Sequence, residues 1–235
     1  MTKAGQQEFV FRTWGGRRKG AGRKPRVLGR IGVPHATRPL HRATTPVHVT
    51  LRAVRLAPNL RLPVIFEVID RELRAASRQG LRVVHFSVQS DHVHLIVEAM
   101  DHESLWRGLQ RFESRVAMEL NRVARRSGKL WRERYHRHDL ATPSQVRNAY
   151  VYVLMNVRKH DFVNASILDH HLSTLDPRSS APWFTGWHPE ARPPPRELAA
   201  STLPSPVVAP RSWLAATGWR DCGLIRFDEM PRTRR

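Results

Sequence analysis

The sequence predicts an α+β protein with a ferredoxin-like antiparallel sheet, in the order β-α-β-β-α-β followed by a further helix. Two kinds of segment predict this fold. Short segments alternate apolar and polar residues, as strands do, and longer ones repeat apolar residues at helical spacing. Their order is typical of helices packed on an antiparallel sheet. We therefore divide the chain into a basic flexible arm (1–45), a folded domain (46–165) and an irregular C-terminal extension (166–235).

Local signals mark the ends of the predicted elements. Gly80 is placed to end the first helix, and Asp101 to cap the second. Thr142 and Gln145 form a capping box around Pro143, which begins the third helix. We expect strands at 46–54, 82–89, 92–98 and 130–140, and helices at 63–78, 101–127 and 143–160.

The C-terminal extension differs in composition from the domain. Prolines become frequent beyond residue 176, as expected of irregular structure. Its tryptophans suggest that parts of it dock onto the domain. We expect a short helix at 213–219 with Gly218 as its stop.

Charge indicates the class of partner. The chain has 235 residues, a formal net charge of +20 and a sequence pI near 11.6. Such a surplus favours a polyanion, because neutralised phosphates release their counterions. No apolar run approaches the roughly 18 residues of a membrane span. The start of the sequence lacks a secretory signal, and the single cysteine excludes a zinc site built on several thiolates. We expect a cytoplasmic nucleic-acid-binding protein without a membrane partner.

Part of this charge lies in a glycine-rich stretch of the N-terminal arm. Such a tract cannot build a core, and we expect it to contact DNA phosphates. A loose likeness to arms that read the minor groove is the alternative. The expected DNA-binding residues of the arm are Arg17, Arg18, Lys19, Arg23, Lys24 and Arg26.

Two histidines one residue apart are the main candidates for metal binding. In a strand, His92 and His94 share one face, while Val93, Leu95 and Val97 share the other. The apolar face is expected to be buried, which leaves the two imidazoles on the opposite surface. Imidazoles held side by side are suitable ligands for a divalent metal. The alternative is a chance pair of solvated residues, since the chain has 13 histidines.

The third predicted helix carries a candidate nucleophile. Helical geometry places Tyr150 on the buried stripe and Tyr152, Asn156 and Lys159 together on the adjoining flank. On that flank a tyrosine could attack phosphorus, an amide oxygen could complete a metal site, and Lys159 could offset phosphate charge. The alternative is that Tyr152 merely borders the helix's apolar face. Tyr135 is the rival nucleophile.

These motifs resemble a known family. Asp91-His92-Val93-His94-Leu95-Ile96-Val97-Glu98, Tyr152-Val153-Leu154-Met155-Asn156-Val157-Arg158-Lys159-His160 and Leu130-Trp131-Arg132-Glu133-Arg134-Tyr135-His136 are similar to motifs of the IS200-like single-tyrosine HUH transposases, especially the REP-associated (RAYT) kind.

The resemblance implies specific roles. His92, His94 and Asn156 would bind Mg²⁺ or Mn²⁺, and Tyr152 would form a 5′-phosphotyrosine link with single-stranded or hairpin DNA. Many members have Asn where this chain has Asp91, which is either a carboxylate behind a histidine ligand or a turn residue. Many have Pro where this chain has Val157, so we expect the helix to continue here.

The expected function is metal-dependent nicking and strand transfer of single-stranded or hairpin DNA, by a mobile or domesticated transposase. One alternative is a non-catalytic nucleic-acid-binding protein that retains the fold. Another is a metal-dependent phosphoesterase without a covalent intermediate. Relatives include dimers that exchange the tyrosine helix, and we expect a monomer here.

Overall fold

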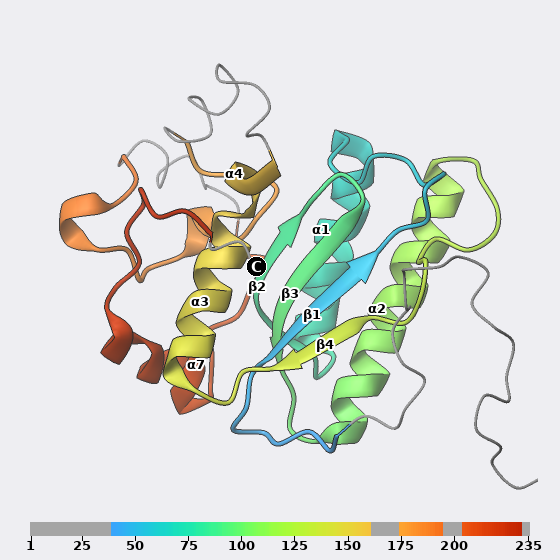
Figure 1. Cartoon of the computed structure of the whole chain (residues 1–235). Coiled ribbons are helices and arrows are strands. Elements are labelled where there is room, and N and C mark those ends of the chain that lie inside the picture. Colours follow the sequence, from blue (N-terminus) through green and yellow to red (C-terminus); the bar gives the residue numbers. More distant parts are fainter. Residues whose placement is uncertain (1–38, 161–173, 195–203, 232–235) are drawn as a thin grey trace, which may run out of the picture. The chain divides into compact units, whose positions relative to one another are not determined.

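Four antiparallel strands form the centre of the structure (Figure 1). The computed structural model describes residues 39–160, 174–194 and 204–231, which belong to one unit spanning 35–235. The sheet has the order β2-β3-β1-β4, and every neighbouring pair is antiparallel. This arrangement confirms the predicted fold class. The strands are β1 (Val47–Arg52), β2 (Arg82–Val88), β3 (His92–Glu98) and β4 (His136–Asp139).

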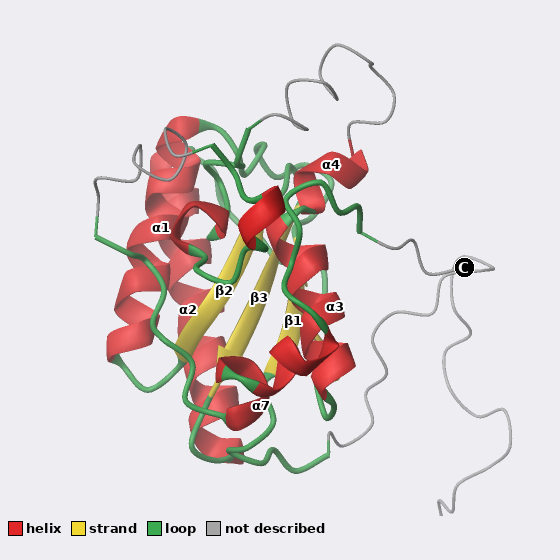
Figure 2. Ribbon diagram, turned by 90° about the vertical axis from the view of Figure 1, so that its left-hand side faces the viewer, coloured by secondary structure: helices red, strands yellow, loops and turns green. Residues whose placement is uncertain are grey.

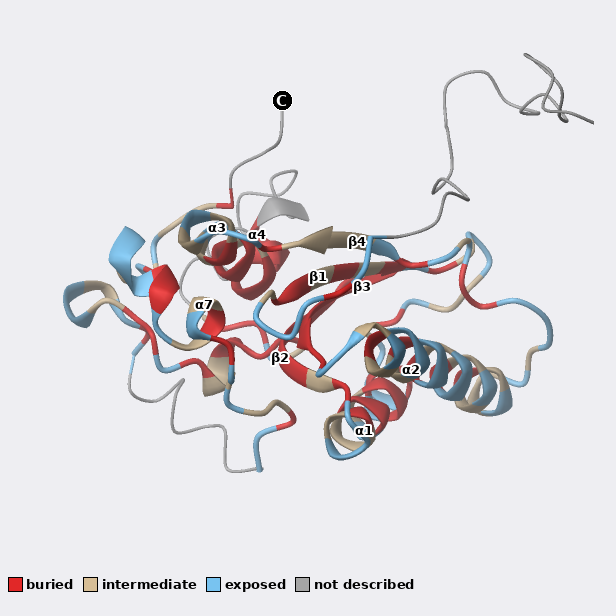
Figure 3. Ribbon diagram, turned by 90° about the horizontal axis from the view of Figure 1, so that it is seen from below, coloured by how far each residue is buried: buried red, intermediate tan, exposed pale blue. Residues whose placement is uncertain are grey.

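Two long helices cover one face of the sheet. These are α1 (Pro63–Arg78) and α2 (His102–Val123), which lie side by side against β1, β2 and β3 (Figures 2 and 3). Alternate residues of β1 and β3 point into this layer and are fully buried. The result is a continuous apolar core, which includes Val49, Leu95, Leu73 and Phe112.

The opposite face is covered by α3 (Pro143–Leu154) together with the C-terminal extension. Figure 1 shows the extension beside α3, on the side away from α1 and α2. Trp187 and Trp219 are buried in this second core, as expected of docked segments, whereas the Trp213 side chain is largely exposed. The Tyr150 hydroxyl donates to the carbonyl of Ala215 at 2.7 Å, which joins the two parts directly.

The buried carboxylate of Glu98 also anchors the extension. It accepts hydrogen bonds from the backbone of Arg211 and from both the backbone and the hydroxyl of Ser212, at 2.6–2.9 Å. Ser212 in turn caps the short helix α7 (Trp213–Ala216). Thus β3 carries the histidine pair at one end and the anchor of the extension at the other.

The predicted helix starts are confirmed. Asp101 accepts a hydrogen bond from the Ser104 amide at 2.7 Å, and both bonds of the Thr142–Gln145 capping box are present. Gly80 follows the end of α1 with a positive φ of 95°, a conformation in which glycine is least strained. These signals succeed because each depends only on neighbouring residues.

Two predicted elements have different bounds. The last regular strand is only β4. Trp131 still forms an isolated antiparallel bridge with Ala53 beyond the end of β1, but the irregular residues 132–135 separate this bridge from β4. The tyrosine helix does not run unbroken to 160. It is interrupted at Met155 and resumes as α4 (Asn156–His160), although no proline is present.

A tertiary contact accompanies this break. The Arg158 side chain is buried, donates to the carbonyl of Phe227 and lies 4.4 Å from the centre of the Phe227 ring. Burial lowers the pKa of Arg158 to about 10.

The predicted short helix is present and ends before Gly218, but this glycine does not have the positive φ of a typical glycine stop. Helix α7 ends at Ala216, and the chain continues through a 3₁₀ turn, η3 (Gly218–Cys222). Gly218 instead permits a close approach, since a Cβ there would lie 2.7 Å from the Trp213 ring. Among the helices that the structure describes, none is long and apolar enough to cross a membrane.

Candidate active site

The histidine pair lies on the face of β3 that is turned towards α3. In the sheet, His94 pairs with Thr50 of β1, and His92 pairs with Arg52. Both histidines are buried, with 5% and 3% of their surface exposed. The expectation that they stand on an open surface is therefore wrong, because α3 covers this face of the sheet.

The ring of His94 is held from β1. Its Nδ1 atom lies 3.0 Å from the Thr50 hydroxyl and 3.2 Å from Nε2 of His48. When Nδ1 carries the proton, Nε2 of a neutral imidazole has a free lone pair, which is the form that binds a metal. The packing of β1 against β3 therefore fixes the orientation of this ring.

The ring of His92 is held by its neighbour in the sequence. Its Nδ1 lies 2.6 Å from Oδ1 of Asp91, whose other oxygen lies 3.5 Å from Arg52. Partial burial raises the pKa of Asp91, but the hydrogen bond with His92 and the charges of His92 and Arg52 outweigh this effect. The pKa therefore lies below its ordinary value. An ionised carboxylate only accepts, so Nδ1 of His92 donates and a neutral ring presents Nε2 elsewhere.

Tyr152 packs against these histidines. The centre of its ring lies 5.0 Å from that of His94 and 5.7 Å from that of His48, both in edge-on contacts. The rings of His92 and His94 are themselves 4.7 Å apart. The structure thus brings a tyrosine on α3 together with a histidine pair on β3.

The other two tyrosines of the chain are in the cores. Tyr150 is 1% exposed, as predicted, and burial, with a contribution from the charge of Glu98, raises its pKa well above the ordinary value. Tyr135, the rival nucleophile, is buried in the core formed with α1 and α2. Only Tyr152 is both partly exposed and in contact with the histidines.

Asn156 begins α4 and is completely buried. Its amide oxygen and nitrogen make no hydrogen bond with any residue that the structure describes. A buried amide without partners costs roughly 1–3 kcal/mol, so such a group calls for a ligand.

The donor set fits a hard divalent cation. Two imidazole nitrogens and an amide oxygen would make a mixed site of the kind that accepts Mg²⁺ or Mn²⁺. Among the residues that the structure describes, no three His, Cys, Asp or Glu side chains cluster as a metal site. A metal on the two histidines would therefore depend on amide, water or phosphate oxygens for its other ligands.

A pocket of about 450 Å³ opens beside Tyr152 and His94. His136 and His138 of β4 line it, on the same face as His48 and Thr50. Sequence reasoning missed these four residues. The signal was available, because His48 and Thr50, like His136 and His138, are spaced two apart in predicted strands and so share a face.

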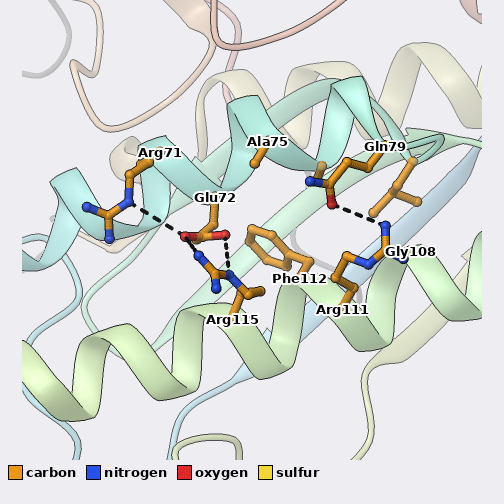
Figure 4. Close-up of a pocket in the computed structure, with 10 residues that line it drawn as sticks. Arg71, Glu72, Ala75, Gln79, Gly108, Arg111, Phe112 and Arg115 are labelled. Carbon is orange, nitrogen blue, oxygen red and sulfur yellow. Dashed lines mark hydrogen bonds and ion pairs between the residues drawn. The ribbon is translucent and has the colours of Figure 1, made fainter.

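A larger pocket, of about 630 Å³, lies between α1 and α2 (Figure 4). The carboxylate of Glu72 is buried there between the guanidinium groups of Arg71 and Arg115, at 3.4–3.6 Å. Arg111 on α2 donates to Gln79, the residue after the end of α1, across the same pocket. It contains no histidine or tyrosine, so we base the candidate active site on chemistry rather than on pocket size.

The predicted DNA-binding residues of the arm, Arg17 to Arg26, lie outside the described residues. The backbone of Lys159 belongs to α4, but its side chain is also outside the description. The role of these residues in DNA binding stays a prediction.

The fold and the site together define an α+β protein with a histidine and tyrosine cluster between its antiparallel sheet and a covering helix. Residues 55–153 match the model of a protein family described as "Transposase IS200 like". This segment, which makes up less than half of the chain, is similar to the IS200-like transposase family, and the match agrees with the resemblance identified from the motifs. The matched segment contains His92, His94 and Tyr152 but ends before Asn156.

Among solved structures, the chain is similar to a REP-associated tyrosine transposase bound to a REP hairpin. The two are 14% identical, the match covers 75% of this chain and 92% of that one, and the TM-score is 0.48. A likeness of this degree says nothing about what this chain binds. The curated proteins include no match to the sequence.

Proposed function

We propose that this protein is a metal-dependent endonuclease and strand transferase that nicks single-stranded or hairpin DNA through a 5′-phosphotyrosine intermediate. The observation that carries the proposal is the contact between the Tyr152 ring and His94, beside His92. The similarity of residues 55–153 to the IS200-like transposase family supports it.

Tyr152 is the nucleophile in this proposal. Its hydroxyl oxygen forms a bond to phosphorus, and the bond between phosphorus and the 3′ oxygen breaks. The proton lost by the tyrosine is balanced by a proton gained at the departing 3′ oxygen. A hydroxyl on a second DNA end reverses these steps, which transfers the strand.

The protein positions the participants before reaction. Thr50 and His48 hold the ring of His94, and Asp91 holds that of His92, so both Nε2 atoms have fixed directions. Tyr152 is restrained by its ring contacts on α3, whose start is fixed by the Thr142 capping box. Such restraint lowers the entropic part of the barrier.

His92, His94 and Asn156 are the residues that would hold Mg²⁺ or Mn²⁺. When bound, such a cation neutralises charge on the phosphate and on the leaving oxygen. The buried, unbonded amide of Asn156 supports this assignment. We further propose that the protein acts as a cytoplasmic monomer, with the arm residues and Lys159 contacting phosphates.

Two other functions predict different products. A non-catalytic DNA-binding protein would bind hairpins without cutting them. A phosphoesterase that activates water would cut DNA but leave no protein attached. The ring contact of Tyr152 with His94 favours the covalent mechanism over both.

The test is to incubate the full chain with hairpin-containing single-stranded DNA and Mn²⁺ and to digest the product for mass spectrometry. We expect a nucleotide remnant on Tyr152. Tyr152→Phe removes only the attacking oxygen, so it should fold normally and form no adduct. Tyr135→Phe is the control and should retain adduct formation. A remnant on another residue, or cutting by Tyr152→Phe, would refute the proposal.

A further inference from the structure

The pocket beside Tyr152 has three walls. Strands β1 and β4 form one side, and α3 forms another. Residues 229–230 of the C-terminal extension close a third side. Since Tyr152 and His94 themselves line the pocket, its contents would lie next to any phosphate that Tyr152 attacks.

Some polar side chains of this pocket are already engaged. Arg147 donates to both oxygens of Glu229, at 2.6 and 3.1 Å, and to the carbonyls of Gly223 and Leu224. Gln145 is committed to the capping box. These bonds fix α3 against the extension and so fix the shape of the pocket.

Other polar side chains of the pocket are unused. His136, His138 and Asn148 line it, and none of the three makes a hydrogen bond with another described residue. Asn148 is exposed on α3, and the histidines project from β4 on the other side. Each can both donate and accept, whereas the walls between them include the apolar side chains of Leu140 and Val151.

We propose that this pocket binds the base of a nucleotide that flanks the scissile phosphate, and that His138 and Asn148 select which base is accepted. The inference rests on the proposed function, because it takes the phosphate to lie at Tyr152. Polar groups that recognise a planar ring between apolar walls are typical of sites for unstacked bases. An asparagine amide can pair with the edge of adenine through two hydrogen bonds.

A phosphate site would have a different composition. Arg147, which lines the pocket, is already paired with Glu229, and the unused groups are an amide and two imidazoles. Sequence is read by hydrogen bonds to base edges, which an amide and imidazoles can make, whereas positive charge is the main attraction for phosphate. The pocket therefore contributes selectivity for sequence, whereas basic residues elsewhere contribute general affinity.

The experiment uses a pool of synthetic DNA with one fixed hairpin and randomised single-stranded flanks. The non-cleaving Tyr152→Phe protein is allowed to bind the pool in Mn²⁺, and the bound DNA is sequenced. We expect a base preference at one flanking position. Adding Asn148→Ala or His138→Ala should weaken this preference about tenfold, within the range for one bidentate contact. Ser144→Ala, an exposed change on the same helix, is the matched control and should leave the preference unchanged.

The proposal is overturned if Tyr152→Phe shows no preference at any flanking position, or if both pocket variants keep the full preference. Because this selection measures binding, it does not depend on cleavage. The proposed function fails separately, through the absence of an adduct on Tyr152 in the parent protein.

Discussion

The two faces of the sheet are built from the same strands yet serve different purposes. On β3, Val93, Leu95 and Val97 enter the core under α1 and α2, while His92 and His94 lie under α3. Both sets are buried, so burial alone does not distinguish the faces. What differs is that the apolar set is held by packing, whereas a ring nitrogen of each histidine is oriented by a polar neighbour, Thr50 for His94 and Asp91 for His92. The polar face therefore holds its side chains in fixed directions.

The largest expected effects come from adjacent residues on opposite faces. Leu95→Ala should lower the free energy of unfolding by about 2–5 kcal/mol, because it leaves a cavity in a packed core. His94→Ala should instead leave the protein folded and abolish adduct formation.

Urea denaturation and the adduct assay measure the two outcomes on the same preparations. A His94→Ala protein that cuts DNA at the parent rate in Mn²⁺ would contradict the assignment of this face. Equal loss of stability in both variants would remove the contrast between the faces.

A smaller effect is expected at Asp91, behind the proposed metal ligand His92. Asp91→Asn keeps the shape of the side chain but weakens the hydrogen bond that orients His92. Changes of this kind typically reduce metal affinity by about 10–100-fold. Isothermal titration calorimetry with Mn²⁺ measures this affinity directly.

Arg52→Ala is the matched control for Asp91→Asn. It removes only the exposed ion pair with Asp91, which is expected to contribute little. If both variants lose the same affinity for Mn²⁺, Asp91 acts through its charge rather than by orienting His92.

The smallest and least selective effect is expected for the N-terminal arm. Deleting residues 12–26 should weaken binding to all DNA by a similar factor of a few at about 0.15 M salt, where charges are screened beyond about 8 Å. It should also flatten the dependence of affinity on salt concentration. Binding isotherms at several salt concentrations, with two unrelated hairpins, provide the measurement. A changed preference between hairpins would show that the arm reads sequence.

The parts of the fold that depend on neighbouring residues could be predicted from the sequence. Asp101 and Thr142 cap helices through contacts within three residues, and the alternation in β3 sorts its side chains between two faces. The break at Met155 could not be predicted, because it accompanies a contact between Arg158 and Phe227, far apart in the sequence.

The candidate site likewise combines features that local geometry predicts with features that depend on distant contacts. The pairing of His92 with His94 follows from strand geometry, and the placement of Tyr150 and Tyr152 on different faces follows from helix geometry. The burial of the histidines was missed because it depends on α3 packing over the sheet. The pocket was missed because His138, Asn148 and Glu229 meet only in the folded chain.

The anchoring of α3 by the C-terminal extension has a consequence for synthesis. Tyr150 bonds to Ala215 and packs against Trp219, and Arg147 bonds to Glu229. A ribosome makes α3 about seventy residues before these partners, so the helix that carries Tyr152 cannot acquire its outer packing while the chain is still being extended through them. Contacts between such distant residues are slow to form. A newly made chain therefore could not complete the packing of α3, or the pocket beside it, until Glu229 had left the ribosome.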